Sequence, residues 1–401
     1  MNAQTVPPHV PPHLVRNFDY FHPGEGIDIY QGFKEVQDAE PSIFYSPLHG
    51  GHWVVTRYNE MSEIFENAAD FSNRHQTVPK NPLVLPLLEY DGDIHRDFRR
   101  LLLPFFTPKS IRHLETVSRD LTISLIDNFY DKGECDFVAE FTLKMPIMIL
   151  MSLLGLPPED TPYLLPISED IVRSGDPQVQ EAAFARVFEY IATQVIPKRR
   201  ANPGDDIFSA LIAGTVEDGR PLTDEEIMGV GGVLIAAGLD TVAGMLGFIA
   251  IFLAENPDHR KQLVDDPSLI NKALEEMLRR HHLANVARMV TRDLDFHGVQ
   301  MKAGDCVLLA TSLAGIDDQR YENPMEVDFD RVDNQKIVFG RGPHQCIGSF
   351  LARTELRVFL QEWLKRIPDF SIKPGETPVI VAGKANSVRY LPLVWPAPSK
   401  S

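Results

Sequence analysis

Phe-Gly-Arg-Gly-Pro-His-Gln-Cys-Ile-Gly, residues 339–348, runs directly into a helical pattern and carries one cysteine, Cys346. A cysteine in a glycine-rich loop at the start of a helix meets backbone N–H groups and the positive end of the helix dipole, which favour its thiolate form. The glycines of this loop permit backbone conformations closed to other residues and allow close approach to a large flat partner. Phe339 can shield the sulfur from water. The loop is therefore suited to hold an anionic sulfur against a flat group.

An anionic sulfur in such a loop is suited to be the axial ligand of a haem iron. A lone cysteine beside glycines is more often inert, so the loop by itself leaves both interpretations open. The spacing Phe-x-x-Gly-x-x-x-Cys-x-Gly resembles the haem-thiolate loop of the cytochrome P450 monooxygenases. The resemblance implies haem b as the cofactor, with Cys346 as the iron ligand and with Phe339, Gly348 and His344 around the haem.

The composition limits the size, partners and compartment of the protein. With 401 residues and 44% hydrophobic content the chain can bury a large core, and no linker or repeat divides it, so we expect one domain, residues 1–401. The net charge of −17 argues against nucleic acid and anionic membrane surfaces as partners. Three scattered cysteines fit a reducing compartment, and the polar, proline-rich residues 1–12 lack the pattern of a signal peptide. We therefore expect a cytoplasmic protein.

Helical patterns dominate the chain. A long apolar helix is expected to begin at Thr223, because Glu226 completes a capping box with it. Strand character is confined to a hairpin over residues 43–56 and to residues 287–309. This predicts a mainly α fold with a small β part. The resemblance implies the single-domain cytochrome P450 fold, in which a long central helix crosses the haem and the cysteine loop lies on its proximal side. Further helices are expected over residues 109–130, 137–154, 181–200 and 206–213.

The long apolar segment contains Ala-Ala-Gly-Leu-Asp-Thr at residues 236–241. An interior glycine costs about 1 kcal/mol relative to alanine, and a buried carboxylate costs several kcal/mol unless it is paired. Gly238 leaves space for a flat cofactor, the Thr241 hydroxyl can bond back to the Ala237 carbonyl, and Asp240 can relay protons. The alternative is an aspartate paired with an arginine and a threonine packed like a valine. The segment resembles the family's Ala/Gly-Gly-x-Asp/Glu-Thr signature, which implies that Asp240 and Thr241 are catalytic and supply protons for dioxygen activation.

Basic residues gather in a segment that starts at residue 93. His95 and Arg99 are four residues apart, so they share one face of a helix and offer donors suited to a carboxylate. A solvated charged face is the alternative. The resemblance implies that His95 and Arg99 bind a haem propionate. It implies the same for Arg288 and His344, which match further propionate-binding positions of the family.

Glu276 and Arg279 place opposite charges three residues apart on a helix. Such a pair contributes only a few tenths of a kcal/mol when it is exposed. The family has a Glu-x-x-Arg pair here that packs with a later arginine in a structural role, and Arg331 fits that third position. Glu275 and Arg280 could form competing pairs, so the assignment of Glu276, Arg279 and Arg331 depends on the resemblance.

The apolar segment 78–88 is broken by three prolines, so it can be neither a long helix nor a central strand. It is either a loop packed on the core or part of a lid over a substrate pocket. The chain resembles most the bacterial camphor-hydroxylase subfamily, whose ketone-binding tyrosine is matched here by Leu83. We therefore expect a small apolar terpenoid or an ionone-like norisoprenoid as substrate, with Asn285 as its polar contact unless Asn285 is a turn residue. The full set of expected contacts is Thr77, Leu83, Val233, Ala237, Ala284, Asn285 and Ala385.

The expected reaction is the hydroxylation of an unactivated C–H bond with dioxygen and two electrons. No flavin or nicotinamide motif is visible, so the electrons must come from other proteins. The resemblance implies a 2Fe-2S ferredoxin and its NAD(P)H-dependent reductase, with Arg96, Arg99 and Arg100 as a docking patch. A peroxygenase or isomerase without a redox partner, and a non-enzymatic haem or gas sensor, are the alternatives.

Overall fold

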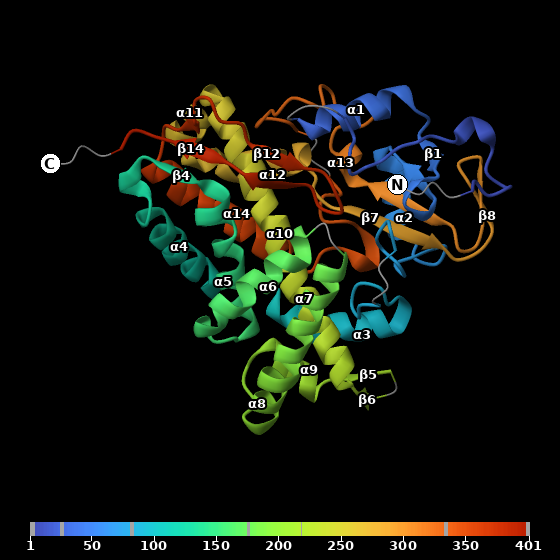
Figure 1. Ribbon diagram of the computed structural model, residues 1–401, viewed down its shortest axis with the longest axis horizontal. Coiled ribbons are helices and arrows are strands. Elements are labelled where there is room, and N and C mark those ends of the chain that lie inside the picture. The colour runs from blue at the N-terminus through green and yellow to red at the C-terminus, as the bar shows by residue number, and fades with distance from the viewer. Residues whose placement is uncertain are drawn as a thin grey trace. The chain divides into compact units, whose positions relative to one another are not determined.

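The computed structural model describes residues 5–24, 28–80, 84–174, 177–217, 219–332 and 336–397 (Figure 1). The chain divides into two compact units, each assembled from segments that are distant in sequence. The first unit comprises residues 1–84, 271–346 and 379–389, and the second comprises residues 85–270, 347–378 and 390–401. The cysteine loop ends the middle segment of the first unit, whereas the long apolar helix belongs to the second.

The first unit combines a five-stranded sheet with short helices. Its strand order is β1-β2-β10-β7-β3, and only the β2–β10 pair is parallel. These strands are β1 (Ile43–Ser46), β2 (His52–Val55), β3 (Phe71–Ser72), β7 (Asn285–Val290) and β10 (Cys306–Ala310). Two antiparallel pairs join β8 (Leu294–Phe296) to β9 (Val299–Met301) and β12 (Val379–Val381) to β13 (Ser387–Tyr390). The helices are α1 (Ile29–Ala39), α2 (Tyr58–Glu66), α12 (Ile270–Arg280) and α13 (Thr311–Ala314).

The hairpin predicted over residues 43–56 is present. Strands β1 and β2 pair antiparallel, with Ile43 opposite Val55. The connecting turn uses positive φ values of 93° at Gly50 and 78° at Gly51, which glycine adopts without strain. Because β2 also pairs with β10, this N-terminal hairpin joins the strands that the sequence predicted within residues 287–309.

The second unit is mostly helical. A short antiparallel sheet of order β11-β14-β4 joins the C-terminal segment to β4, and β5 pairs with β6. Its strands are β4 (Glu134–Asp136), β5 (Thr215–Val216), β6 (Arg220–Pro221), β11 (Ser371–Ile372) and β14 (Pro392–Val394). Its helices are α3 (Gly92–Leu102), α4 (Arg112–Asp127), α5 (Lys144–Leu154), α6 (Thr161–Arg173), α7 (Pro177–Tyr190), α8 (Ile196–Ala201), α9 (Ile207–Ala213), α10 (Asp224–Glu255), α11 (Pro257–Asp265) and α14 (Ser349–Arg366).

The long apolar helix is α10, and it begins where the sequence predicted. The Thr223 hydroxyl accepts from the N–H of Glu226, and the Glu226 carboxylate accepts from the N–H of Thr223. The helix is long and apolar enough to cross a membrane, but 76% of its most apolar window is buried in the protein. The helix therefore lies mostly buried within the second unit.

Helices α4 and α14 lie side by side and run in the same direction (Figure 1). Two ion pairs show the common direction. Glu115 of α4 pairs with Arg357 of α14, and about one turn further along both helices Arg119 pairs with Glu362. The C-terminal half of α14 is anchored by Trp363, which is fully buried and lies 4.9 Å from the Phe137 ring between centroids. The N-terminal ends of the two helices consequently meet at one end of the pair.

Candidate active site

The cysteine loop is a tight structure closed by its own backbone. The Cys346 N–H donates to the Phe339 carbonyl over 2.8 Å, around a short 3-10 turn at Gly342–His344. Gly340 and Gly342 both adopt a φ of 68°, a left-handed conformation that favours glycine. The Cys346 side chain is exposed, and the chain enters α14 three residues later. The loop therefore leaves its thiol accessible to a ligand.

Phe65, near the end of α2, supports this loop and one of the predicted propionate ligands. A Cβ on Gly342 would lie only 2.5 Å from the Phe65 carbonyl oxygen, so only glycine permits this approach. The Arg288 guanidinium lies 5.0 Å from the centre of the Phe65 ring, within the range of a cation–π contact. Arg341 donates to the Ser62 hydroxyl on the same helix over 2.6 Å. Helix α2 thus brings Arg288 and the cysteine loop together, and no sequence motif pointed to Phe65.

The other two cysteines are unsuited to bind a metal. Cys135 in β4 and Cys306 in β10 are each 6% exposed. Burial raises the pKa of the Cys135 thiol, and it raises the pKa of Cys306 to about 11. A thiol held protonated is a poor ligand and a poor nucleophile. Cys346 is the exposed cysteine of the chain.

One face of α10 opens near its middle. Val233 is buried, but Ala237 is exposed and Thr241 is half-buried, and the three residues are four apart on one face. The Thr241 hydroxyl donates to the Ala237 carbonyl over 3.1 Å, as the sequence predicted. Asp240, the neighbouring acid, is 6% exposed. The expected catalytic pair therefore lies beside the exposed part of an otherwise buried helix.

Gly238 lies where α10 packs closely against α5. A Cβ at this position would lie 3.1 Å from the Leu150 Cδ2 of α5, tighter than ordinary van der Waals contact. The missing side chain therefore faces the neighbouring helix α5 and permits the close packing of two helices. The expected approach of a flat cofactor at Gly238 stays a prediction, and the close packing against Leu150 is a second reason for a glycine here.

Helix α3 carries the basic residues predicted to bind a propionate. His95 is 1% exposed and Arg99 is half-buried, and their spacing places them on one face of the helix. Arg96 pairs with Asp93, and Arg100 pairs with Asp97 over 3.2 Å. Arg96 and Arg100 thus already have acidic neighbours on their own helix, which weakens them as the docking patch expected from the sequence.

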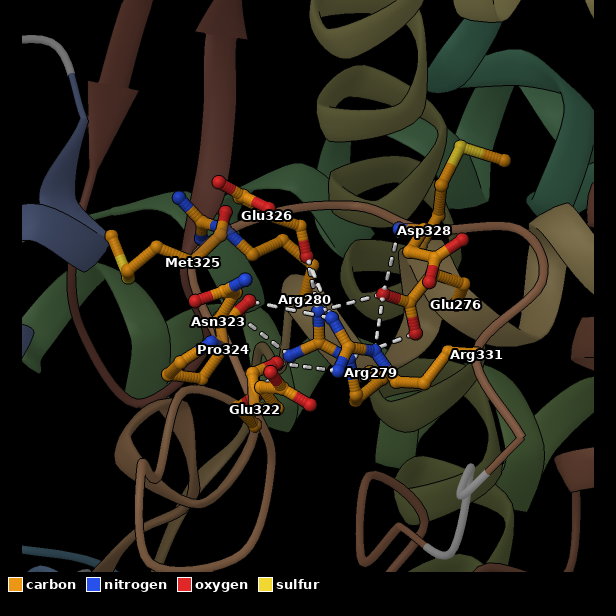
Figure 2. Close-up of polar contacts among 12 residues, drawn as sticks. Glu276, Arg279, Arg280, Glu322, Asn323, Pro324, Met325, Glu326, Asp328 and Arg331 are labelled. Atoms are coloured by element: carbon orange, nitrogen blue, oxygen red, sulfur yellow. Dashed lines mark hydrogen bonds and ion pairs between the residues drawn. The ribbon is translucent and has the colours of Figure 1, made fainter.

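Glu276, Arg279 and Arg331 form one buried cluster in the first unit (Figure 2). Glu276 is 3% exposed and accepts two bonds of 2.8 Å from Arg279 and one of 3.0 Å from Arg331. Arg279 is 0% exposed and donates to the Pro324 and Glu326 carbonyls, each over 2.7 Å. The cluster therefore ties α12 to the segment that leads to the cysteine loop.

The possible competing partners are engaged elsewhere. Glu275 pairs with Lys336 over 2.7 Å, and Arg280 pairs with Asp28 over 2.9 Å. The structure thus brings together the three residues that the resemblance implied and separates their neighbours from them.

The expected substrate contacts of the first unit gather at the beginning of β7. Ala284 forms an isolated bridge with Ala385, and both are half-buried. Asn285 is 2% exposed, and its side-chain N–H donates to the Gly383 carbonyl over 2.8 Å. Its amide therefore holds the turn that carries Ala385, while Asn285 itself is the first residue of β7 and not a turn residue. Thr77 donates to the Pro79 carbonyl over 2.9 Å, and Leu83 lies outside the described residues.

Comparison with known proteins decides the family. A family model described as Cytochrome P450 matches residues 175–384, which is more than half of the chain. A probable cytochrome P450 127A1 of Sinorhizobium fredii is 35% identical over 98% of this chain and 98% of its own. The chain belongs to the cytochrome P450 family. A steroid C26-monooxygenase of Mycolicibacterium smegmatis is 31% identical over 85% of this cytochrome P450 and 87% of its own length.

Solved structures agree with this assignment. The crystal structure of CYP101J2 matches this cytochrome P450 with a TM-score of 0.91 and 37% identity over 98% of this chain and 100% of that one. That of CYP101C1 matches with a TM-score of 0.88 and 33% identity over 98% and 100%. The predicted cytochrome P450 fold, the haem b cofactor and the monooxygenase class are thereby confirmed, as is the likeness to the bacterial camphor-hydroxylase group.

Proposed function

We propose that this cytochrome P450 hydroxylates a small, largely apolar substrate in the cytoplasm and takes its electrons from a 2Fe-2S ferredoxin served by an NAD(P)H-dependent reductase. The observation that carries the proposal is the exposed Cys346 thiol in a loop whose two left-handed glycines are packed against α2. When bound there, haem b supplies the activation of dioxygen that no amino-acid side chain can perform. The residues of the chain supply its binding, its protons and the contact with a partner.

Cys346 is the proposed ligand of the iron. It alone among the three cysteines is exposed, and the other two are held as protonated thiols. The closed loop keeps the thiol at a fixed place, and the backbone around it favours the thiolate. Arg288, held over Phe65 beside the loop, and the basic face of α3 formed by His95 and Arg99 offer donors for two propionates.

Asp240 and Thr241 are the proposed proton-handling residues. The Thr241 hydroxyl stands on the open face of α10 and is held there by its bond to the Ala237 carbonyl. A hydroxyl in that position can hold water or pass a proton without a change in the helix. Asp240 is 6% exposed, and a nearly buried carboxyl can exchange protons between solvent and such a hydroxyl.

The shared N-terminal end of α4 and α14 is the proposed docking surface for the ferredoxin. Phe350, one turn into α14, is 51% exposed. Lys109 and Arg112, at the start of α4, are exposed, and neither forms an ion pair within the parts of the chain that the structure describes. An exposed aromatic residue among cations, in a chain of net charge −17, suits a small acidic partner. This surface replaces the α3 arginines as the main docking site.

Reconstitution tests the proposed function. The haem-loaded protein is mixed with ferredoxin, reductase and NADH, with limonene, β-ionone and perillic acid as probes. We expect NADH consumption that depends on a probe, with a hydroxylated product. Hydroxylation that needs only hydrogen peroxide, and is unchanged when ferredoxin is omitted, would contradict the proposed electron source.

Charge reversal tests the docking surface. Arg112→Glu should slow electron transfer from ferredoxin about tenfold or more, with the largest effect at low salt, because charges at the rim of an interface govern association. The matched control is Lys198→Glu on α8, an exposed lysine outside this surface that undergoes the same change of charge. Equal rates in the two variants would show that the ferredoxin binds elsewhere.

A further inference from the structure

The turn between β12 and β13 is fixed onto the beginning of β7. The Asn285 N–H donates to the Lys384 carbonyl, and the Asn285 side chain donates to the Gly383 carbonyl, both over 2.8 Å. Ala385, the next residue, forms its bridge with Ala284. The Lys384 backbone therefore stands at a fixed position beside Ala284, Asn285 and Ala385, which the sequence analysis expects to contact the substrate.

Lys384 has no acidic partner among residues 5–24, 28–80, 84–174, 177–217, 219–332 and 336–397. The chain has 56 acidic residues against 39 basic ones, so an isolated ammonium requires an explanation. The Lys384 side chain is exposed, yet the protein around it lowers its pKa through desolvation. Exposure and partial desolvation occur together when protein surrounds part of a side chain and solvent reaches the rest of it. A small molecule can therefore reach this ammonium, around which protein replaces part of the water.

A haem propionate is one possible carboxylate for this lysine, but the strand geometry argues against it. Arg288, the proposed propionate ligand of β7, follows Asn285 by three residues. A strand advances about 3.3 Å per residue, so Arg288 stands about 10 Å further along β7 than the backbone that binds Lys384. This separation favours two different carboxylates for Lys384 and Arg288, and the variants below distinguish a propionate from a substrate.

We propose that Lys384 binds the carboxylate of the substrate, and that this cytochrome P450 acts on small apolar organic acids. The inference rests on the proposed function and narrows it, because it replaces a neutral terpenoid by an acid with an apolar body. The body would lie against the small side chains of Ala284 and Ala385, and the carboxylate would accept from the ammonium. Since a bond between two charged groups strengthens when water is kept away, the acid should bind about tenfold or more tightly than its ester.

Matched acids and esters test the proposal. The probes are perillic, octanoic and decanoic acids and their methyl esters, whose binding to the haem-loaded protein is measured by calorimetry. In the native protein at least one acid should bind about tenfold or more tightly than its own ester. Lys384→Met should abolish this preference while it leaves the affinity of the ester unchanged, and Lys384→Arg should restore most of it.

Lys302→Met is the matched control, because Lys302 is a lysine of the same unit whose ammonium pairs with Asp293 over 2.7 Å. It should retain the preference for acids. The proposal is overturned if no acid in the series binds more tightly than its ester, or if Lys384→Met keeps the preference. It is also overturned if Lys384→Met lowers haem content or shifts the haem spectrum without a change in acid binding, since the lysine would then serve a propionate.

The binding measurement separates this inference from the proposed function. If the protein prefers acids in a way that depends on Lys384 but forms no hydroxylated product, the proposed carboxylate site is supported and the proposed hydroxylation is rejected. If the protein hydroxylates neutral probes but does not bind the acids, the proposed hydroxylation is supported and the proposed carboxylate site is rejected.

Discussion

The cluster around Glu276 and the middle of α10 each bury an acidic residue, but they leave their surroundings in opposite states. Glu276 accepts four bonds from Arg279, Arg331 and the Asp328 N–H, and Arg279 is itself fully buried. Around Asp240, in contrast, the same helix exposes Ala237 and leaves Thr241 half-buried. The comparison teaches that burial of an acid does not by itself indicate catalysis. The saturated cluster holds a segment in place, whereas the proposed proton-handling residues stand where the helix is partly exposed.

The largest loss of stability is expected when the buried cluster of Glu276, Arg279 and Arg331 loses its carboxylate. Glu276→Gln removes the charge that balances two buried guanidinium groups, so it should lower the free energy of unfolding by about 3–5 kcal/mol. Chemical denaturation of the haem-loaded protein measures this loss. Glu275→Gln, one residue away, changes a carboxylate that is 25% exposed and keeps part of its contact with water, so it should cost less, about 1 kcal/mol. Similar losses in both variants would mean that the cluster is no more than a surface ion pair.

A substitution at Thr241, on the partly exposed face of α10, should change the reaction and leave the stability of the fold almost unchanged. Thr241→Ala removes a hydroxyl that bonds only within its own helix, so stability should change by less than about 1 kcal/mol. The fraction of NADH that yields hydroxylated product should fall about tenfold or more, with hydrogen peroxide formed instead. Thr241→Ser, which keeps the hydroxyl, should retain most of the product. Unchanged coupling in Thr241→Ala would remove Thr241 from the proton path.

Glu355 on α14 offers a third case, because it is as buried as Glu276 but one of its carboxyl oxygens lacks a hydrogen-bond partner among the described residues. It is 3% exposed, and its Oε2 meets no hydrogen-bond partner within the described parts of the chain. Burial raises its pKa well above the ordinary value of 4.5, so the folded protein keeps a proton that the unfolded chain releases. Stability is therefore lost as the pH rises from about 4.5 towards the folded-state pKa, by up to about 1.4 kcal/mol per pH unit.

Glu355→Gln removes this loss, since glutamine has no proton to release. The variant should gain stability relative to the native protein, and the gain should grow with pH above about 4.5. Unfolding by denaturant at a series of pH values measures it. Glu362→Gln on the same helix, where the carboxylate pairs with Arg119, should lose stability instead. A gain that does not vary with pH would show that Glu355 is ionised in the fold.

The smallest effect is expected at Gly238. Alanine favours the helix by about 1 kcal/mol over glycine, but its Cβ would press on Leu150 at 3.1 Å. The two effects should nearly cancel, and the haem spectrum of Gly238→Ala should match that of the native protein. Gly232→Ala, whose Cβ would lie 2.7 Å from a ring carbon of Phe188, should be more destabilising. A shifted haem spectrum in Gly238→Ala would instead support the expected approach of a flat cofactor at Gly238.

Features that depend on neighbouring residues could be predicted from the sequence. The capping box at Thr223 and the hairpin over residues 43–56 follow local rules of backbone geometry. The bond from Thr241 to Ala237 belongs to the same class, because it spans one helical turn. These predictions agree with the structure because the partners are close in the chain.

Features that join distant segments could not be predicted in this way. The ring of Phe65 supports Arg288 across more than two hundred residues, and the sheet of the second unit pairs β14 with β4. Asn285 was expected from the sequence only as a substrate contact or a turn residue. The partner of its amide lies on another segment, so its structural role was visible only in the fold. The close approach of Leu150 to Gly238 was hidden for the same reason, since Leu150 is on another helix.

The carbon monoxide difference spectrum of the reduced, haem-loaded protein tests the proposed bond between Cys346 and the iron most directly. The native protein should give the red-shifted band of a thiolate-bound haem, and Cys346→Ser should lose that band while Cys306→Ser keeps it. A red-shifted band of full intensity in Cys346→Ser would contradict the assignment of the thiolate ligand.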